Sequence, residues 1–519
     1  TFFPASSMPF WADVEVRTVD PSRGKGIYPK TDLKRHTTFL SDQPLACLQK
    51  RAQQSSHVVC VRCNKFLGSL QLHLHLLQGN LTSADVMKTE ECSAYVKQPL
   101  LPRDPRSDGE DEHTVGHLTP IVVDEVFSKY RSLTPFAFYC SDECRQAGQR
   151  ALSVLRYPSC VPIFESLVGL SHRANNVFLT MLAILLSAVV SELDDHAASP
   201  PNKRQKTEQG HQTSGGSDPD HGGSSSTSTS KALNVLRRLV RKPIHEVLDV
   251  PEDCTAEELR RELKEESQQA ISLIRQLLVC SGSMATYPWL EQEFLSEDAF
   301  DLWLGALGLN VISVKVPHPI VFFLEAINDM KDDDGAKKEL IEVLAPSLCQ
   351  LNRAKMAKEQ QKERQDAEEG EGGNASDDDE SGEASSDSSE GSDASDDDRE
   401  ADVLFWDWSG YNSSGDDTAL LGSLSSELFP SFKGYALFPV FSLLNHSCEP
   451  NSESTYVDRN TISAFTTRDV AAGEELTISY IDNTMSLADR REELRGYGFV
   501  CTCPKCEREA AGGLLQKET

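Results

Sequence analysis

A chain of 519 residues is long enough to bury a large core and to form two to four domains, so a single small binding module is excluded. The net charge of −30 argues against nucleic acid as a direct partner. Residues 366–402 alone carry −16 of this charge, so the remainder of the chain is only mildly acidic.

Hydropathy and cysteine content predict where the protein works. No apolar run is long enough to cross a bilayer, and the longest, at 177–190, is predicted to be a buried helix. The N-terminal residues lack the basic start and the long apolar centre of a signal peptide, so we expect no secretion. Fourteen cysteines therefore favour a reducing compartment, where clustered thiols bind metal more often than they form disulfides. Four of them lie outside the zinc motifs and are predicted to be ordinary buried thiols: Cys47, Cys254, Cys280 and Cys349.

Residues 13–47 begin with alternating apolar and polar positions, which a glycine-containing segment then interrupts. This pattern predicts a strand, a glycine turn and a second strand. The turn reads RGKG, in which two glycines allow backbone to approach a ligand and two cations suit a carboxylate. These residues are Arg23, Gly24, Lys25 and Gly26.

The segment 57–160 is rich in cysteine and histidine and is predicted to be a zinc-binding insert. Its spacing Cys60-x-x-Cys63 and Cys140-x-x-x-Cys144 supplies four thiols, the number that a closed tetrahedral zinc site takes. A second zinc site remains open, and its candidate ligands in this insert are Cys92, Cys160, His73, His75 and His113.

Helical leucine spacing follows at 161–198 and 232–357, so we predict a mostly α-helical insertion. Residues 199–230 are rich in Ser and Gly and are predicted to be a flexible loop, because they bury too little apolar surface to offset their ordering entropy. The PNKRQK segment at 201–206 fits either a nuclear-import signal or a solvated charge run. The acidic segment 358–401 is predicted to be disordered and open to phosphorylation.

The C-terminal third contains the most informative motifs. The apolar run 437–444 is predicted to be a strand that leads into the polar turn NHSCEPN at 445–451, where polar groups can converge on a ligand. A period-two segment ends at Tyr480, so its hydroxyl would project from a strand end, although such a tyrosine is often only a core-edge residue. Four further thiols have zinc-ligand spacing: Cys448, Cys501, Cys503 and Cys506.

Taken together, these motifs resemble the SET-domain protein-lysine methyltransferases of the SET-and-MYND group, and in particular the branch with the fifth human member and its fungal counterparts. The resemblance is carried by RGKG at 23–26, CVRC at 60–63, YCSDEC at 139–144, SLLNHSCEPN at 442–451, GEELTISY at 473–480 and GFVCTCPKC at 498–506.

This resemblance implies an α+β fold with a split SET domain of short curled sheets and a pseudoknot. The expected parts are an N-terminal SET segment (13–56), a MYND-like zinc insert (57–160), a helical insertion (161–357) with a loop at 199–230, an acidic disordered loop (358–401), the C-terminal catalytic SET segment (402–482) and a cysteine-rich post-SET zinc region (483–512).

The resemblance also implies S-adenosylmethionine as the cofactor and zinc as a structural metal. Tyr480 would orient the substrate amine and contact the cofactor, and Tyr497 and Phe499 would fold over the cofactor and the lysine channel. The other implied cofactor contacts are Arg23, Gly24, Lys25, Gly26, Asn310, Ser442, Leu443, Leu444, Asn445 and His446. The chain departs from the family at Tyr157, near which the module normally has a histidine ligand, and this departure puts the second zinc in doubt.

The resemblance further implies a protein-lysine N-methyltransferase that acts on histone tails, with histone H4 favoured and ribosomal or other non-histone proteins as the competing substrates. A basic tail suits a mildly acidic groove. The alternative is a zinc-supported interaction or corepressor scaffold whose SET fold is inactive. A zinc hydrolase is excluded, because four-thiol sites leave no open metal position. We expect a monomer in the nucleus, and also in the cytoplasm, with no membrane partner.

Overall fold

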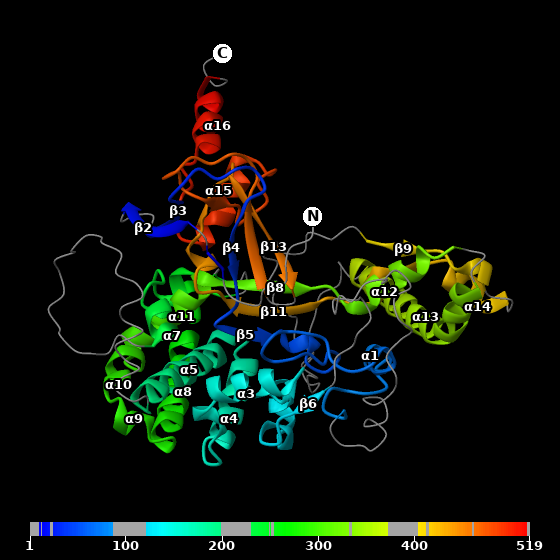
Figure 1. Cartoon of the computed structure of the whole chain (residues 1–519), viewed down its shortest axis with the longest axis horizontal. Helices are drawn as coiled ribbons and strands as arrows, with labels where there is room; N and C mark the ends of the chain where they lie inside the picture. The colour runs from blue at the N-terminus through cyan, green and yellow to red at the C-terminus, as the bar shows by residue number, and fades with distance from the viewer. Residues whose placement is uncertain are drawn as a thin grey trace.

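The computed structural model describes residues 10–11, 13–20, 24–86, 121–198, 230–248, 250, 254–331, 335–371, 403–411, 415–458 and 461–515. Arg23, Cys92 and His113 lie outside these residues, as do most of the two segments that we predicted to be flexible or disordered. Figure 1 shows short sheets at the centre, a layer of helices below them, a helical lobe beside them and the C-terminal helices above.

Two sheets combine strands from both ends of the chain. In the larger one, β4 (Thr38–Asp42) pairs with β14 (Thr461–Thr466), and β1 (Phe10–Trp11) and β13 (Ser452–Asp458) form its edges. In the other, β11 (Phe432–Leu437) lies between β5 (Ala46–Gln49) and β8 (Val311–Val316). The predicted α+β class with short sheets is therefore confirmed.

The two predicted strands are present, since β2 (Val14–Asp20) pairs antiparallel with β3 (Gly24–Pro29), but Gly24, Lys25 and Gly26, which we predicted to lie in the turn, are the first residues of β3. The name glycine turn is kept below for residues 24–26. Residues 161–357, in contrast, are not helical throughout. Strand β8 lies within them because it pairs with β11 along its whole length, and its β-branched residues suit a sheet.

The strand that we predicted at 437–444 is wrong beyond Leu437. Strand β11 ends there, and a 3₁₀ turn, η8 (Phe441–Leu443), follows. Pro439 has no N–H for a strand ladder. The N–H groups of Val440 and Phe441 instead donate to the carboxylate of Asp42, at 2.7 and 2.9 Å.

The acidic segment also begins later than we predicted. Helix α13 (Gly335–Glu371) continues through residues 358–371, which we had assigned to a disordered loop. This part of the helix is rich in Glu, Lys, Gln and Arg, which are good helix formers.

The helices of the insertion lie together below the sheets (Figure 1) and pack around one apolar core. Helix α5 (Val177–Ala198) is, contrary to our prediction, long and apolar enough to cross a bilayer, but 78% of its apolar window is buried inside the structure, as expected of the core helix that we did predict. Its neighbours are α3 (Asp142–Ala151), α4 (Val161–Arg173), α7 (Lys231–Leu236), α8 (Ala256–Cys280) and α11 (Glu297–Asn310).

The remaining described elements are short or belong to peripheral lobes. They are α1 (Leu70–Leu77), β6 (Val122–Val123), β7 (Phe138–Tyr139), α9 (Ser283–Thr286), α10 (Trp289–Phe294), α12 (Pro319–Asn328), β9 (Phe405–Trp406), α14 (Gly415–Leu421), β10 (Leu424–Ser425), β12 (Asn445–His446), β15 (Thr477–Ile478), α15 (Leu487–Gly496) and α16 (Pro504–Leu515).

Three buried histidines from distant parts of the sequence, His57, His73 and His318, lie close together. The ring of His318, at the start of α12, lies 5.0 Å from that of His73 and 6.1 Å from that of His57, measured between ring centroids. His57 also contacts the carbonyl oxygen of Pro430 through Nε2, at 2.9 Å. The Nδ1 atom of His73 and the Nε2 atom of His318 are buried without a hydrogen-bond partner. We call these three residues the histidine junction. Their burial favours neutral imidazoles.

We expect the histidine junction to make the protein unstable in mild acid. Burial lowers the pKa of His73 to about 4 and the pKa of His318 well below its usual value. Because the unfolded state takes up protons near pH 6.5 and the folded state does not, stability is complete above that pH and falls as the pH drops toward 4. The loss is about 1.4 kcal/mol per pH unit for each histidine.

The measurement is the free energy of unfolding at several pH values for the parent chain and for His73→Gln. The variant should show the shallower pH dependence between pH 6.5 and 4, whatever its absolute stability. Acid also releases a thiolate-bound metal, but this effect is the same in both proteins. Identical slopes of unfolding free energy against pH would therefore contradict the assignment of the acid sensitivity to His73.

Candidate active site and thiol clusters

The Asn-His turn and Tyr480 lie together because two very short strands pair in parallel. Strand β12 places Asn445 opposite Thr477 and His446 opposite Ile478. Two residues beyond β15, the backbone N–H of Tyr480 donates to Nδ1 of His446 at 3.0 Å, and the two rings lie 5.4 Å apart. The Tyr480 hydroxyl donates a short hydrogen bond to the carbonyl oxygen of Leu444. The phenol is thus held against the turn that precedes His446.

Asn445 fastens the glycine turn to this centre. Its side-chain nitrogen donates to the carbonyl oxygen of Lys25 at 3.0 Å and to Oε1 of Glu475 at 2.7 Å. A Cβ atom at Gly26 would lie 3.2 Å from that nitrogen and would overlap the Glu475 carboxylate, so a larger residue there would displace Glu475 from its bond to Asn445. Glu475 is a residue whose role we did not predict, although it lies within the GEELTISY motif.

Two further aromatic rings lie over Tyr480. Tyr497 lies 5.1 Å from it, and Phe499 lies 6.4 Å from it and 6.0 Å from His446, between ring centroids. The Phe499 ring meets the Tyr480 ring edge to face, an arrangement that aromatic pairs favour. The aromatic residues predicted to close the site are therefore beside the predicted catalytic tyrosine.

The side chains of segment 442–444 have contacts within the protein. Leu443 and Leu444 are buried in the core, so their side chains face away from a ligand. The Ser442 hydroxyl donates to the carbonyl oxygen of Asn310 at 2.9 Å. The Asn310 amide donates to Ala306 O at 2.7 Å and to Val240 O at 3.4 Å. The side-chain nitrogen of Asn310 therefore has partners within the protein.

Asp42 is a second positioning residue that we missed. Its carboxylate is 2% exposed and accepts the two N–H groups that begin the 440–446 segment. Burial raises the pKa of Asp42, while the donating backbone N–H groups oppose that change. A buried aspartate at the end of a strand has no local sequence signal, because its partners are almost 400 residues away.

The four C-terminal thiols converge directly behind this centre. Those of Cys448, Cys501, Cys503 and Cys506 lie within 4.8 Å of one another. The His446 Nε2 atom lies 3.2 Å from the Cys448 sulfur. Since Nδ1 of His446 accepts a backbone N–H, Nε2 carries the proton and donates to that sulfur.

A buried guanidinium complements the same thiols. Arg490 is 1% exposed, and its Nη2 atom lies 3.8 Å from the Cys506 sulfur and 2.5 Å from Oε2 of Glu509. Four thiolates around one Zn²⁺ leave net negative charge, which this cation offsets. The donor set therefore fits a structural zinc ion.

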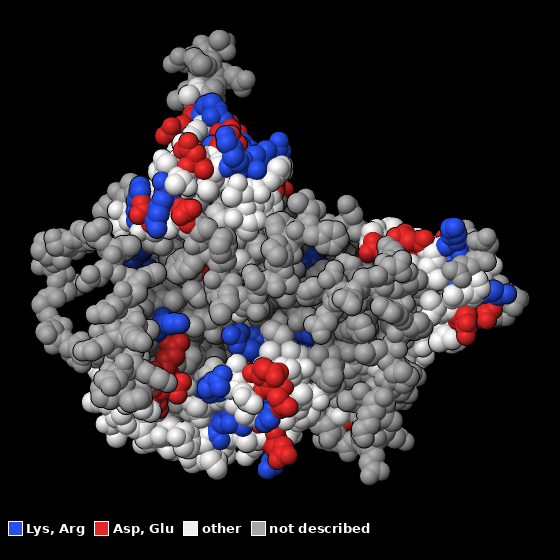
Figure 2. Space-filling model, viewed as in Figure 1, with Lys and Arg blue, Asp and Glu red and all other residues white. Residues whose placement is uncertain are grey.

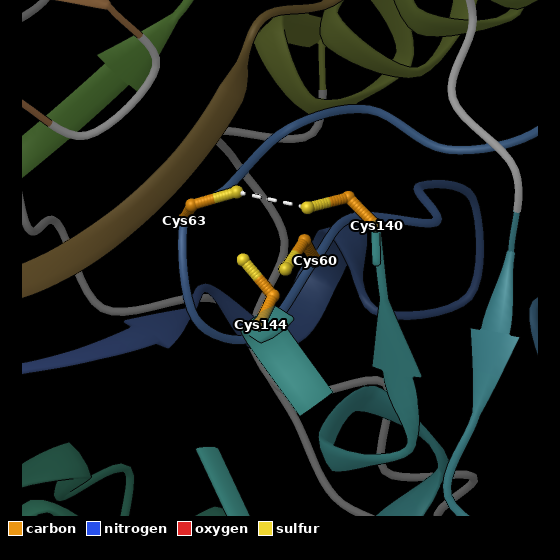
Figure 3. A group of neighbouring side chains, drawn as sticks. All are labelled: Cys60, Cys63, Cys140 and Cys144. Carbon is orange, nitrogen blue, oxygen red and sulfur yellow. Dashed lines mark hydrogen bonds between the residues drawn. The ribbon is translucent and has the colours of Figure 1, made fainter. Parts of the chain in front are cut away.

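The N-terminal thiol cluster is also assembled as predicted (Figure 3). Its sulfurs lie within 4.8 Å of one another, and those of Cys63 and Cys140 are 3.5 Å apart. Cys144 lies in the first turn of α3, where the Ser141 side chain accepts the Cys144 N–H and caps the helix. Cys60 completes the set, so four thiols enclose the position that a zinc ion would take.

The candidate ligands of a second zinc do not converge within the part of the chain that the structure describes. Cys160 lies in the helical core, and its thiol donates to the carbonyl oxygen of Leu277. His73 belongs to the histidine junction, and the His75 ring lies near Asn80.

Among the four thiols that we predicted to be ordinary buried cysteines, Cys349 is buried, but Cys280 is exposed.

Comparisons with known proteins agree with this arrangement. The SET domain family matches residues 326–481. The histone-lysine N-methyltransferase SET5 of Meyerozyma guilliermondii is 44% identical over 78 residues, which are 14% of this chain and 16% of that protein. Human histone-lysine N-methyltransferase SMYD3 is 42% identical over 77 residues, 15% of this chain and 18% of that protein. Human protein-lysine N-trimethyltransferase SMYD5 is 41% identical over 87 residues, 16% of this chain and 21% of that protein.

The matched stretches thus span less than a quarter of the length of these three relatives. Within that limit, the family match, the short sheets and the two thiol clusters agree with one another. The chain therefore contains a SET domain and is similar to the SET-and-MYND-type lysine methyltransferases.

Proposed function

We propose that this protein is an S-adenosylmethionine-dependent protein-lysine N-methyltransferase. The observation that carries the proposal is the meeting of the glycine turn, the Asn-His turn, Tyr480 and two aromatic rings beside one thiol cluster. The names of the three relatives, all lysine methyltransferases, support the same reaction class.

The residues around the glycine turn fit the cofactor. Gly26 lets the backbone of this segment lie against Glu475 and Asn445, and Asn445 holds it in place. Burial, together with the nearby Arg238, lowers the pKa of Lys25, so an anion is favoured beside these two cations. The cofactor carboxylate is such an anion. When bound, the cofactor supplies the electrophilic methyl group, and the protein supplies alignment.

In this proposal Tyr480 and the aromatic rings orient the substrate amine and exclude water from it. A free lysine has a pKa of about 10.4 and is almost fully protonated at neutral pH, so a desolvated environment that lowers this pKa increases the reactive population. The nearest titratable groups already have partners: both ring nitrogens of His446 are engaged, and Glu475 accepts from Asn445. Loss of the amine proton to solvent is therefore favoured over a protein base.

For the substrate we propose basic protein tails, with histone H4 favoured and ribosomal or other non-histone proteins as the competing class. Two of the three relatives are named histone-lysine methyltransferases and one is named a protein-lysine trimethyltransferase. On the face drawn in Figure 2, Lys and Arg are interspersed with Asp and Glu over the described residues, a distribution unlike the basic stripe of a nucleic-acid binder. The nucleus, and also the cytoplasm, fit such substrates.

The second candidate is a zinc-supported interaction scaffold with an inactive SET fold. It would explain the two thiol clusters equally well. It would not explain why Asn445, Gly26 and Tyr480 are all present and interlocked, because a scaffold needs none of them. We therefore favour catalysis.

The test is methyl transfer from tritiated S-adenosylmethionine to recombinant histones and, separately, to ribosomal proteins. Asn445→Ala should weaken cofactor binding by about 10- to 100-fold, since it removes two hydrogen bonds, one of them to a carboxylate. Asn80→Ala, an exposed amide of the zinc insert, is the matched control and should match the parent chain. Equal labelling by Asn445→Ala and the parent would defeat the assignment, and labelling of only one protein set would decide the substrate class.

A further inference from the structure

One segment of the helical insertion crosses both sides of the candidate active site. Val240 lies beside the glycine turn, where a Cβ atom on Gly24 would be 3.4 Å from its Cγ2 atom. Two residues further on, Nζ of Lys242 donates to the carbonyl oxygen of Gly498 at 2.7 Å. Segment 240–244 thus reaches from the glycine turn to the aromatic turn, which we define as residues 497–500.

The base of this segment is firmly held on α11. A Cβ atom at Gly305 would overlap the carbonyl oxygen of Lys242, so the missing side chain lets the segment lie directly on the helix. The Ile244 N–H donates to Oδ1 of Asp301 at 3.3 Å, and the Arg241 guanidinium lies 3.7 Å from the centre of the Trp303 ring. Lys242 therefore extends from a rigid base.

The aromatic turn, in contrast, is held in place mainly at its two ends. Gly498 has a φ of 75°, a conformation that favours glycine, and a Cβ atom there would overlap Nζ of Lys242. Val500 is 67% exposed, so little packing holds it. The chain is tied at Cys501 by the thiol cluster, and the Lys242 contact ties it before that point. Between these two ties lies Phe499, one of the rings beside Tyr480.

We propose that Lys242 is a positioning residue, a latch by which the helical insertion holds the aromatic turn over Tyr480 and the cofactor site. The observation that distinguishes it from a surface lysine is its contact with the one residue between Tyr497 and Phe499, whose rings both lie beside Tyr480. In the absence of the latch, the turn keeps its backbone bonds to the end of α15 and its link to the thiol cluster, but it loses its tie to the helical insertion, and its rings leave the site more often. The catalytic effect rests on the proposed function, whereas the effect on the turn does not.

The experiment compares Lys242→Met and Lys242→Arg with the parent chain, all loaded with zinc. Amide hydrogen exchange of a peptide covering 497–500, without cofactor, should be at least ~10-fold faster in Lys242→Met, because an anchored turn opens less often. The Kd for S-adenosylhomocysteine, measured by calorimetry, and the KM for the cofactor should rise about 10-fold while kcat changes less than ~3-fold, since the latch acts on the closing of the site.

Lys242→Arg keeps a donor at the same position. Its amide exchange rate and its Kd for S-adenosylhomocysteine should therefore stay within ~3-fold of those of the parent chain. Lys231→Met, an exposed lysine of the same insertion, is the control for the loss of charge and should match the parent chain. Parent-like exchange and Kd in Lys242→Met would overturn the latch. If the parent chain binds no S-adenosylhomocysteine, the proposed function fails, and the exchange measurement still decides the latch.

Discussion

Tyr480→Phe should reduce the rate of methyl transfer by at least ~100-fold while leaving cofactor affinity within ~3-fold, because it removes one aligned hydroxyl and keeps the ring. The ring packs against Tyr497 and Phe499, and phenylalanine preserves these contacts. What disappears is the hydrogen bond to Leu444 O and the oxygen that would orient the incoming amine. Single-turnover rates and calorimetric cofactor binding separate the two effects.

The matched control for this variant is Tyr456→Phe. Tyr456 lies on β13, and its hydroxyl also donates to a backbone carbonyl, that of Ser313, at 2.9 Å. Both changes remove a hydroxyl and its bond to a backbone carbonyl, so they should cost similar folding stability, about 1 kcal/mol each. Only the Tyr480 change should abolish transfer, and a comparable rate loss in both variants would assign the effect to stability instead of chemistry.

Cys503→Ser should remove the C-terminal zinc and reduce activity by at least ~100-fold, because zinc binding at a structural site is coupled to local folding. The apolar cluster around these thiols is small, containing only Ile481 and Leu494 besides three of the cysteines as its fully buried members. Without the metal, this cluster is too small to hold the aromatic turn. Zinc stoichiometry by atomic absorption should fall by one ion per chain, and the N-terminal cluster should keep its own.

The effect should reach Tyr480 by a direct route. Cys448 accepts from His446, and His446 accepts the backbone N–H of Tyr480, so two hydrogen bonds join the thiolates to the backbone of Tyr480. Cys280→Ser changes an exposed thiol outside both clusters and is the control. If Cys503→Ser kept full zinc content and full activity, the C-terminal cluster would have no role in the site. Normal activity after reversible removal of that zinc by a chelator would contradict the coupling in the same way.

Much of the candidate site could be predicted from the sequence because its residues occur in short motifs. Cys501, Cys503 and Cys506 lie within six residues, and Asn445, His446 and Cys448 within four, so their spacing alone indicates ligand chemistry. The residues we missed, Asp42, Glu475 and Lys242, act on partners that other segments bring to them. Lys242 reaches Gly498, 256 residues away, and a lysine in a basic segment carries no sign of that contact.

Local pattern also failed where tertiary contacts override it. The apolar run after Leu437 looks like a strand, but its N–H groups bond to Asp42 and the chain turns. Residues 311–316 lie in a helical region, yet they form a strand because β11 offers an open edge on which they complete a sheet. In both places a partner far along the chain decided the conformation.

By itself, the sequence determined the chemistry available to this protein: eight thiols in two zinc-ligand sets, a glycine turn and a strand-end tyrosine. Such properties depend on residue identity and short spacing, which a linear pattern preserves. Only the tertiary structure decided that β12 pairs in parallel with β15, that Asn445 ties the glycine turn to this pair and that the helical insertion reaches the aromatic turn. These contacts join residues up to 420 positions apart, and their geometry follows from packing of the whole chain, which no local spacing encodes.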